Sequence, residues 1–440
     1  MKRLWEPFAY SDGPRADCAW ALDRDWPVLD SEAETDIAIV GGGYTGLSAA
    51  LHLAGAGEQV MVLEAHAPGW GASGRNGGFC CLGGAMASDE TLTRRFGADQ
   101  AGLWVEAEKA AIHLVAGLLA QHGIDAKTHS HGELVLAHSP RAWRGFAADR
   151  SRYTRHGIET ELLPSAALAE RGLKASSMQG GMHVKIGFGL DPGAYAIGLA
   201  RAARAAGADI RGQSEVRRIT REGGTYRLTT PQGSLRARRL LFATNGYSAE
   251  DLPRWLAGRF MPLQSSVMVT RPLTEAERAA QGWTSDLMAY DSRRLLHYFR
   301  LMPDGRFLFG MRGGLKAHPA REARVMARMR ADFEAMFPAW AGVETAHSWS
   351  GLVNLSRGQT PYLGPVPEME NAWTAMAYHG NGVAMASYSG AIMADLIRGR
   401  APDRPFPTVM QAPLARFPLG RRRRVLLAAM TPLLALGDRL

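Results

Sequence analysis

Cysteine is scarce in this chain of 440 residues, which contains only Cys18, Cys80 and Cys81. Three cysteines make no even disulfide framework, and none of them forms a C-x-x-C pair, so the pattern argues against structural zinc. We therefore expect no metal site and a reducing compartment. The N-terminal residues also lack an apolar stretch long enough for a secretory signal, and the expected location is the cytoplasm.

Long apolar runs are also missing. The most apolar segment, residues 425–436, has about a dozen residues, whereas a membrane-spanning helix needs about twenty. It contains Pro432 and follows four consecutive arginines at 421–424. Two interpretations remain open for this tail: a terminal helix packed on the body with its arginines in water, or a basic amphipathic anchor in peripheral contact with a membrane.

Lysine is the third scarce residue, because only six of the 51 basic residues are lysines and arginine dominates the net charge of +9. Apart from residues 421–424, the arginines occur mostly as scattered pairs with little aromatic interleaving, so no nucleic-acid partner is expected. Hydrophobic residues at 46% and charged residues at 21% are ordinary for a globular enzyme. The length predicts two domains with separate cores.

A glycine-rich motif follows the predicted strand at residues 35–40. Gly41, Gly43 and Gly46 have the G-x-G-x-x-G spacing that allows a sharp turn, close approach to a pyrophosphate and tight packing of helix on strand. The helix begins near Tyr44, where unpaired N–H groups and the helix dipole favour an anion. Glu64 closes the second strand, 18 residues after Gly46, and is placed to bind an adenosine ribose.

This motif predicts one dinucleotide site but does not choose between NAD and FAD. No second G-x-G-x-x-G occurs on a strand and helix unit, so nothing indicates a separate NAD(P)H domain.

The rest of the chain alternates helical and strand patterns. Residues 1–34 predict an irregular arm that docks Trp5, Tyr10, Trp20 and Trp26 on the body. Helices are expected at 88–123, 193–206 and 322–337, and a β-meander over 210–243 is expected to join the nucleotide sheet. Strands near 266–270, 296–300 and 307–309 predict a mostly antiparallel substrate domain.

Taken together, the segments resemble the glycine/D-amino-acid oxidase superfamily of FAD-dependent amine oxidoreductases, most closely its γ-glutamylputrescine oxidoreductase-like branch. The resemblance covers nearly the whole chain. The motifs on which it rests are residues 36–46 with Glu64, the loop 69–78 (GWGASGRNGG), Asp191-Pro192, residues 243–247 (ATNGY), residues 361–364 (PYLG) and residues 380–382 (GNG).

The resemblance implies an α/β (α+β) fold, in which a Rossmann-like FAD-binding domain of the glutathione-reductase type is interleaved with a mostly antiparallel substrate domain. The expected boundaries are an arm at 1–34, the FAD domain at 35–88, 150–250 and 345–400, the substrate domain at 89–149 and 251–344, and a tail at 401–440. The expected FAD-binding residues are Gly41, Gly43, Tyr44, Thr45, Gly46, Glu64, Ala72, Ser73, Arg75, Asn76, Gly77, Gly78, Val216, Thr244, Asn245, Gly246, Gly380, Asn381, Gly382 and Val383.

The resemblance also implies the reaction. Hydride leaves the carbon bearing a neutral primary or secondary amine for flavin N5, and the imine then hydrolyses. O2 is the expected electron acceptor, and FAD is expected to be non-covalent because Cys80 and Cys81 match no attachment motif. Arg75 is a candidate to offset phosphate charge, with a structural ion pair as the alternative.

Two departures bear on the substrate. Many amino-acid-oxidising relatives carry an arginine for the substrate carboxylate where this chain has Val353. An extended amine, such as a polyamine conjugate, is therefore favoured over a simple α-amino acid. The substrate carboxylate could instead pair with Arg300, Arg312 or Arg357, although each of these is expected to have a structural role.

His379 precedes a glycine turn in which Asn381 replaces the commoner histidine. We name His379, Tyr298 and Arg300 as candidate catalytic residues, and Tyr290 as a weaker candidate for the wall of the amine pocket. Satisfied core positions remain the alternative for His379 and for both tyrosines.

Three other functions stay open at this point: a quinone-linked amine dehydrogenase at the membrane surface, an FAD-dependent tRNA-modification enzyme, and a binding protein in which FAD is structural.

Overall fold

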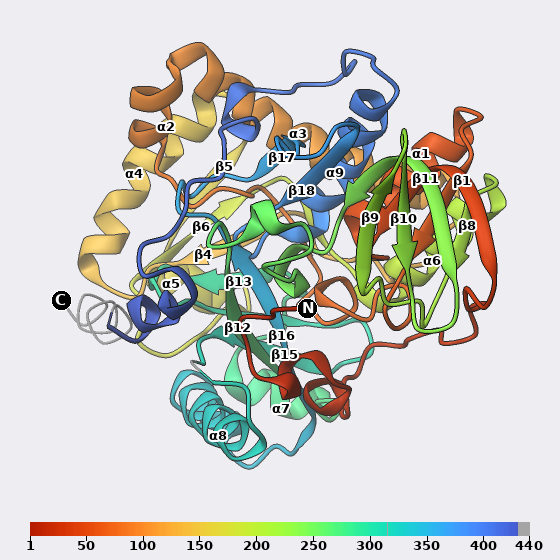
Figure 1. Cartoon of the computed structure of the whole chain (residues 1–440). Coiled ribbons are helices and arrows are strands. Elements are labelled where there is room, and N and C mark those ends of the chain that lie inside the picture. Colours follow the sequence, from red (N-terminus) through yellow and green to blue (C-terminus); the bar gives the residue numbers. More distant parts are fainter. Residues whose placement is uncertain (315, 430–440) are drawn as a thin grey trace.

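Two eight-stranded sheets and a two-stranded ribbon are formed by residues 1–314 and 316–429, which are the residues described by the computed structural model (Figure 1). The path of the first sheet is β17 (Tyr362–Pro365), β18 (Ala372–Met376), β11 (Ser234–Phe242), β1 (Glu32–Val40), β2 (Val60–Leu63) and β8 (Asp209–Arg211). From β18 to β8 the strands are parallel. Residues 37–40 of β1 are all buried, as expected for an inner parallel strand covered on both faces.

The predicted β-meander over 210–243 is confirmed for β9 to β11, whereas the strand expected at 210 is β8, which pairs parallel with β2 at the other edge of the sheet. β9 (Arg218–Glu222) pairs antiparallel with β10 (Thr225–Thr229), which pairs antiparallel with β11. The ribbon joins β3 (Phe79–Cys80) to β7 (Phe188–Gly189).

The second sheet is antiparallel except for one pair, as the sequence predicted for the substrate domain. Its order is β16 (Thr345–Leu355), β12 (Met261–Thr270), β15 (Phe307–Arg312), β14 (His297–Leu301), β13 (Met288–Asp291), β4 (Glu133–Leu136), β6 (Gly180–Val184) and β5 (Thr160–Pro164). Only β13 and β4 run parallel. An aromatic cluster that includes Trp283, Phe299, Phe307 and Phe337 fills the core of this domain.

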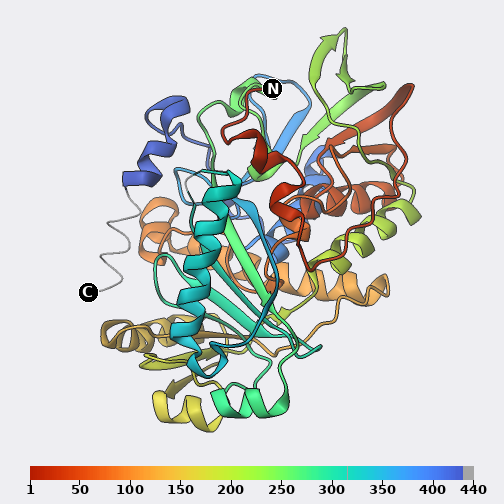
Figure 2. The ribbon, with the colours of Figure 1, turned by 90° about the horizontal axis from the view of Figure 1, so that it is seen from below.

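Helices cover both sheets. Their bounds are α1 (Tyr44–Gly55), α2 (Asp89–Phe96), α3 (Ala98–Gln121), α4 (Pro140–Arg155), α5 (Ser165–Glu170), α6 (Pro192–Ala205), α7 (Glu275–Gln281), α8 (Pro319–Met336) and α9 (Gly382–Ile397). The helix expected at 88–123 is two helices, because Gly97 between them has φ +87°. Figure 2 shows α8 lying across the second sheet, where Met329 and Phe333 enter its core.

The strands divide between the sheets differently from the expected domain boundaries. β5 and β6 lie in the second sheet, although residues 150–250 were expected in the cofactor domain, and so does β16, at the start of the expected segment 345–400. α3, which was expected in the substrate domain, packs against α9 in the core of the first sheet. Short strands that pair only with distant segments carry no local signal of the sheet they join.

The arm and residues 421–424 of the tail contact each other on the body. The arm buries Trp5, Tyr10, Trp20 and Trp26, as predicted. The expectation for the tail arginines was wrong in part, because Arg423 is fully buried and pairs with Glu250 at 2.5 Å.

The next tail arginine also contacts the body: Arg424 pairs with Glu6 at 3.1 Å, and its guanidinium lies 4.0 Å from the Trp5 ring. Residues 430–436 of the predicted anchor lie outside the described residues. No helix among the described residues is both long and apolar enough to cross a membrane.

Candidate functional site

The first of two neighbouring cavities opens at the turn between β1 and α1. Gly41 has φ +108°, and a Cβ there would lie 2.9 Å from the Ala243 carbonyl oxygen. A Cβ on Gly46 would collide with the Gly41 carbonyl, so that glycine allows α1 to pack on its strand. Gly43 differs, because its Cβ would meet only the Ser73 side chain, at 3.0 Å, and the residue lines the cavity. The three glycines therefore have the three separate steric roles expected of a dinucleotide turn.

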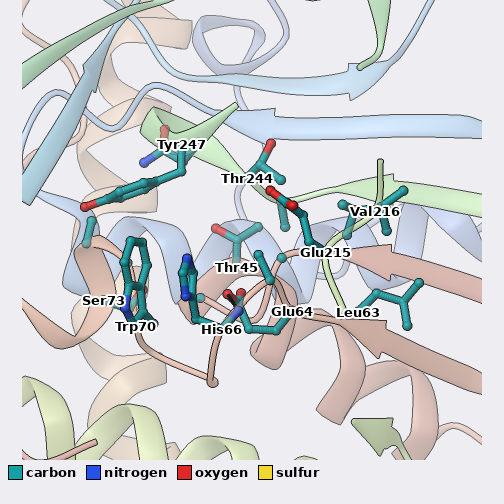
Figure 3. A pocket seen from close by; sticks show the side chains of 18 of the residues that line it. Thr45, Leu63, Glu64, His66, Trp70, Ser73, Glu215, Val216, Thr244 and Tyr247 are labelled. Atoms are coloured by element: carbon teal, nitrogen blue, oxygen red, sulfur yellow. Dashed lines mark hydrogen bonds between the residues drawn. The ribbon is translucent and has the colours of Figure 1, made fainter. Parts of the chain in front are cut away.

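Glu64 stands at the end of β2 and lines the same cavity (Figure 3). Its Oε2 accepts from the Gly42 N–H at 2.7 Å and its Oε1 from the His66 N–H at 3.0 Å. These backbone bonds hold the carboxylate in place, while burial raises its pKa. The position and the free lone pairs fit an acceptor for ribose hydroxyls.

The loop 69–78 lies between the two cavities. Ser73 Oγ accepts from the Tyr44 N–H at 2.9 Å, and Asn76 Nδ2 donates to the Ser73 carbonyl at 2.8 Å. Arg75 donates to the Trp70 carbonyl at 2.8 Å and stacks 4.0 Å from the Trp70 ring, but its buried Nη2 has no partner among the described residues. Arg75 is thus braced by the protein and keeps one donor for a ligand.

The arm completes the first cavity, which sequence reasoning did not foresee. Arg3 and Tyr10 line it, and Arg3 pairs with Glu215 at 2.6 Å. Figure 3 shows Glu215 and Val216 beside Glu64, and the stacked rings of His66 and Trp70 nearby. An irregular arm has no periodicity from which such a docking position can be read.

The second cavity lies between loop 69–78, the second sheet and the start of α9. Its walls include Phe79, Tyr290, Leu296, Tyr298 and Val353. It shares Ala72 with the first cavity. The bond of 2.7 Å between Thr45 Oγ1 and the Tyr378 hydroxyl joins the start of α1 to the turn before α9. One elongated ligand can therefore contact both helix starts.

The N-terminus of α9 faces the second cavity. Gly380, with φ +102°, Asn381 and Val383 line the cavity, and no side chain among residues 1–314 and 316–429 caps this helix. An uncapped N-terminus offers N–H groups and a positive dipole end to a ligand. Together with the N–H groups of the glycine turn and the acceptor oxygens of Glu64, it provides the polar groups that a dinucleotide with a redox-active ring requires.

Most of the predicted cofactor residues line one of the two cavities. Four of them, Gly46, Gly78, Gly246 and Gly382, do not. Three of them pack closely on backbone: a Cβ on Gly46 or Gly78 would collide with a carbonyl, and one on Gly246 would lie 3.1 Å from the Leu352 carbonyl. Gly382 is the first residue of α9, and a Cβ there would make only an ordinary contact of 3.9 Å with Tyr378.

His379 lines the second cavity, but its ring is committed elsewhere. The imidazole has Nδ1 3.0 Å from the Gly84 carbonyl and Nε2 3.1 Å from the Ser356 N–H, so Nδ1 carries the proton and Nε2 accepts. Burial lowers its pKa to about 4. This neutral histidine holds the turn before α9 against segment 81–87, and neither nitrogen is left to exchange a proton with a substrate. The geometry does not support the predicted catalytic role.

We expect His379 to contribute a pH-dependent term to stability. In the unfolded chain its pKa is about 6.5, so as the pH falls from 6.5 to 4 the unfolded state binds the proton first and the folded state loses up to about 3 kcal/mol. His129, whose pKa burial also lowers to about 4, acts in the same window. In thermal melts across this range, His379→Gln should flatten the loss of stability. Equal slopes in the two proteins would show that His379 is already protonated when folded.

Arg300 is also placed differently from the prediction. The guanidinium donates to the Gly77 carbonyl at 2.8 Å and the Leu190 carbonyl at 2.8 Å, and it contacts His129 Nε2 at 2.6 Å. Arg300 does not line either cavity, so we correct its catalytic assignment to a structural one that braces loop 69–78. Tyr298 does line the second cavity, with its hydroxyl 3.1 Å from Ser265 Oγ.

Arg312 is the arginine that the structure brings to the second cavity in place of Arg300. It ends β15, and a Cβ on Gly380 would collide with its Nη2. Among the described residues it has no ion pair and no hydrogen bond with another side chain, and burial lowers its pKa. An unpaired cation beside an uncapped helix N-terminus favours a negatively charged group in this part of the cavity.

Comparisons with known proteins agree with this geometry. A model of the FAD dependent oxidoreductase family, DAO, matches residues 36–396. The chain is 32% identical over 422 residues to a probable oxidoreductase, OrdL, of Rhizobium meliloti (strain 1021), with 94% of each chain covered. It is 30% identical over 404 residues to the gamma-glutamylputrescine oxidoreductase of Escherichia coli (strain K12), which covers 91% of this chain and 92% of the relative. The solved glycine oxidase from Geobacillus kaustophilus shares the fold, with a TM-score of 0.72, 20% identity and coverage of 88% of this chain and 99% of that one.

Proposed function

Because the chain belongs to the DAO family of FAD-dependent oxidoreductases, we propose that it oxidises the C–N bond of a primary or secondary amine bound in the second cavity. The main support for this proposal is that two cavities adjoin each other at Ala72. The first contains the dinucleotide turn, and the second has aromatic walls beside the uncapped N-terminus of α9. The product is an imine, which water hydrolyses to a carbonyl compound and an amine or ammonia.

The first cavity is assigned to the adenosine and diphosphate end of FAD, with Gly43, Glu64, Val216 and Thr244 in contact with it. The second is assigned to the flavin and the substrate. When bound, FAD supplies the two-electron acceptor, and the protein supplies position and electrostatics. Arg312 and the start of α9 stabilise negative charge at the edge of the cavity that they share.

The same positive charge acts on the substrate amine. Arg312 disfavours a second cation close by and so lowers the pKa of an amine bound near it. The reaction needs the amine in its neutral form, and His379 is not free to act as a base. We therefore assign deprotonation to binding, with no dedicated side-chain base.

The walls favour an extended amine. Phe79, Tyr290, Leu296 and Tyr298 present aromatic and apolar surface. Val353, at the position where many amino-acid-oxidising relatives carry an arginine, lines the same cavity. The other two guanidinium groups of this cavity are assigned to the cofactor: the free Nη2 of Arg75 lies in loop 69–78, and Arg312 lies beside the start of α9. A simple α-amino acid would leave its carboxylate beside Val353.

The test is an anaerobic screen of the protein with its flavin bound. Mono- and diamines, N-alkylated amines and α-amino acids are added, and the visible absorbance of the flavin is followed. We expect extended amines to bleach the flavin faster than glycine or alanine does. If dithionite reduces the flavin but no amine or amino acid does, the proposal is wrong.

The electron acceptor is tested separately. We propose O2, so that admitting air after bleaching restores the flavin and releases hydrogen peroxide. A flavin that reoxidises only with a quinone favours the dehydrogenase. The ion pairs of Arg423 and Arg424 with the body leave fewer tail arginines available for a membrane surface.

We also predict that FAD is held without a covalent bond. All three cysteines are free, and burial raises the pKa of the Cys80 and Cys81 thiols, which makes them poor nucleophiles. Acid precipitation of the protein should therefore leave all the yellow colour in the supernatant. A pellet that stays yellow after washing contradicts this.

A further inference from the structure

A third cavity adjoins the second one and has a different chemical character. It lies between β4, β13 and the helices α2, α3 and α4, and it shares Ala85 and Tyr290 with the second cavity. Segment 81–87 passes between the two. Its lining includes the carboxyl groups of Asp89, Glu108 and Glu133.

The sheet register explains why an acid stands in this position. Side chains alternate along a strand, and Glu133 lies on the same face of β4 as Val135. Val135 packs with Tyr290 against the core of the first sheet, whereas Leu134 and Leu136 pack in the core of the second. Glu133 therefore points out of the second sheet, toward the cofactor domain.

The carboxyl groups exceed the cations that line the cavity. Arg152 is already paired with Asp89 at 2.7 Å, and His156 is the other basic residue in the lining. Neither Glu108 nor Glu133 forms an ion pair with any of the described residues. Glu133 is only 1% exposed, and its Oε2 has no hydrogen-bond partner there.

Burial disfavours the ionised form of these two carboxyl groups when no cation is bound beside them. It raises the pKa of Glu108 to about 8 and that of Glu133 to about 7, although the neighbouring Cys81 and Tyr290 side chains oppose the rise at Glu133. A cation placed between them would favour the ionised forms. The aromatic rings of Trp104, Tyr153 and Tyr290, which also line the cavity, suit an organic cation.

A metal ion is a poor occupant by comparison. Among residues 1–314 and 316–429, no group of three or more histidine, cysteine or acidic side chains is arranged to hold one. An ammonium group needs fewer ligands and donates three hydrogen bonds.

We propose that this acidic cavity binds the distal ammonium group of a diamine or polyamine whose other nitrogen is oxidised in the second cavity. The aliphatic chain of the substrate passes Ala85 and Tyr290, and Glu108 and Glu133 pair with the far nitrogen. The inference rests on the proposed amine oxidation and adds a substrate class to it. It also gives each cavity its own charge preference: Arg312 favours a neutral amine, and the carboxylates favour a charged one.

The test compares 1,4-diaminobutane, 1,6-diaminohexane and spermidine with monoamines of matched length, butylamine and hexylamine. Flavin reduction is measured in wild-type holoenzyme, Glu133→Gln and Glu108→Gln. Glu106→Gln is the matched control, because Glu106 lies on the same helix as Glu108 but pairs with Lys109 and does not line the cavity. We expect wild type and the control to favour at least one of the two diamines over its matched monoamine, or spermidine over butylamine, by about tenfold or more in kcat/KM.

Each cavity variant should raise KM for the diamine at least about tenfold more than KM for the monoamine. A second readout is independent of turnover: the diamine should raise the melting temperature of wild type more than that of Glu133→Gln. Equal effects on diamine and monoamine, or a shifted pH profile with unchanged diamine preference, would overturn the inference and assign Glu133 to proton transfer or to folding.

The two proposals fail in different ways. If monoamines bleach the flavin as well as diamines do, amine oxidation stands and the distal site is wrong. If no amine bleaches it, the proposed function itself has failed.

Discussion

Replacing Gly43 by alanine is expected to remove bound FAD while the chain stays folded. Gly43 caps α1 with φ −87° and ψ −177°, a conformation that alanine adopts without strain. The new methyl group would meet only the Ser73 side chain, at 3.0 Å, yet it would occupy the space at the helix start that the diphosphate must approach. We expect FAD to bind at least about 100-fold more weakly, or ~2.8 kcal/mol, with amine oxidation lost in proportion.

Two further glycines on the same helix serve as controls. Gly46→Ala should destabilise the fold itself, because its Cβ would collide with the Gly41 carbonyl. Gly55→Ala has open space around it and should leave FAD binding unchanged without lowering stability. Flavin content per protein, the dissociation constant on reconstitution and thermal melts of the apoproteins separate the cases. A Gly43→Ala protein with full flavin and an unchanged dissociation constant would remove the first cavity as the diphosphate site.

The glycine turn was predictable from the sequence because its constraints are local. Gly41, Gly43 and Gly46 are required by contacts within one strand, turn and helix unit, and Glu64 ends the next strand. The family match and the relatives confirm the resemblance and FAD as the cofactor. The fold class is confirmed by the structural neighbours.

The substrate side was less predictable because it depends on contacts between distant segments. His379 is neutral and fixed because its ring is hydrogen-bonded to the Gly84 carbonyl and the Ser356 N–H. No local sequence pattern predicts either partner. The sequence also did not show that Arg312, and not Arg300, lines the second cavity. Arg300 is buried and Arg312 is partly buried, and the placement of β14 and β15 against loop 69–78 decides which of them meets the cavity.

One missed residue did have a signal. Glu133 begins the apolar strand Glu133–Leu136, and an acid inside such a strand is costly unless something pairs with it. The sequence analysis predicted neither this short strand nor its partners β6 and β13. The burial of Glu133 could therefore not be predicted. A carboxylate in an otherwise apolar strand is therefore worth treating as a candidate site residue on the sequence alone.

Replacing Arg312 by methionine is expected to lower kcat by about 100-fold or more and to lower the reduction potential of the bound flavin. The reason is electrostatic: Arg312 lies beside the uncapped start of α9 and has no ion pair among the described residues. Its removal withdraws stabilisation from negative charge that develops in that part of the cavity.

The melting temperature of Arg312→Met should not fall, because an unpaired charge is costly to bury and methionine fills similar space. Arg312→Lys should recover part of both losses, since it keeps the charge without the planar guanidinium. Arg357→Met is the matched control: Arg357 is exposed, donates to the Arg416 carbonyl and lies outside both cavities. Stopped-flow reduction and redox titration against reference dyes measure the two effects. An Arg312→Met enzyme within threefold of wild type at an unchanged potential would mean that the start of α9 alone supplies the charge stabilisation.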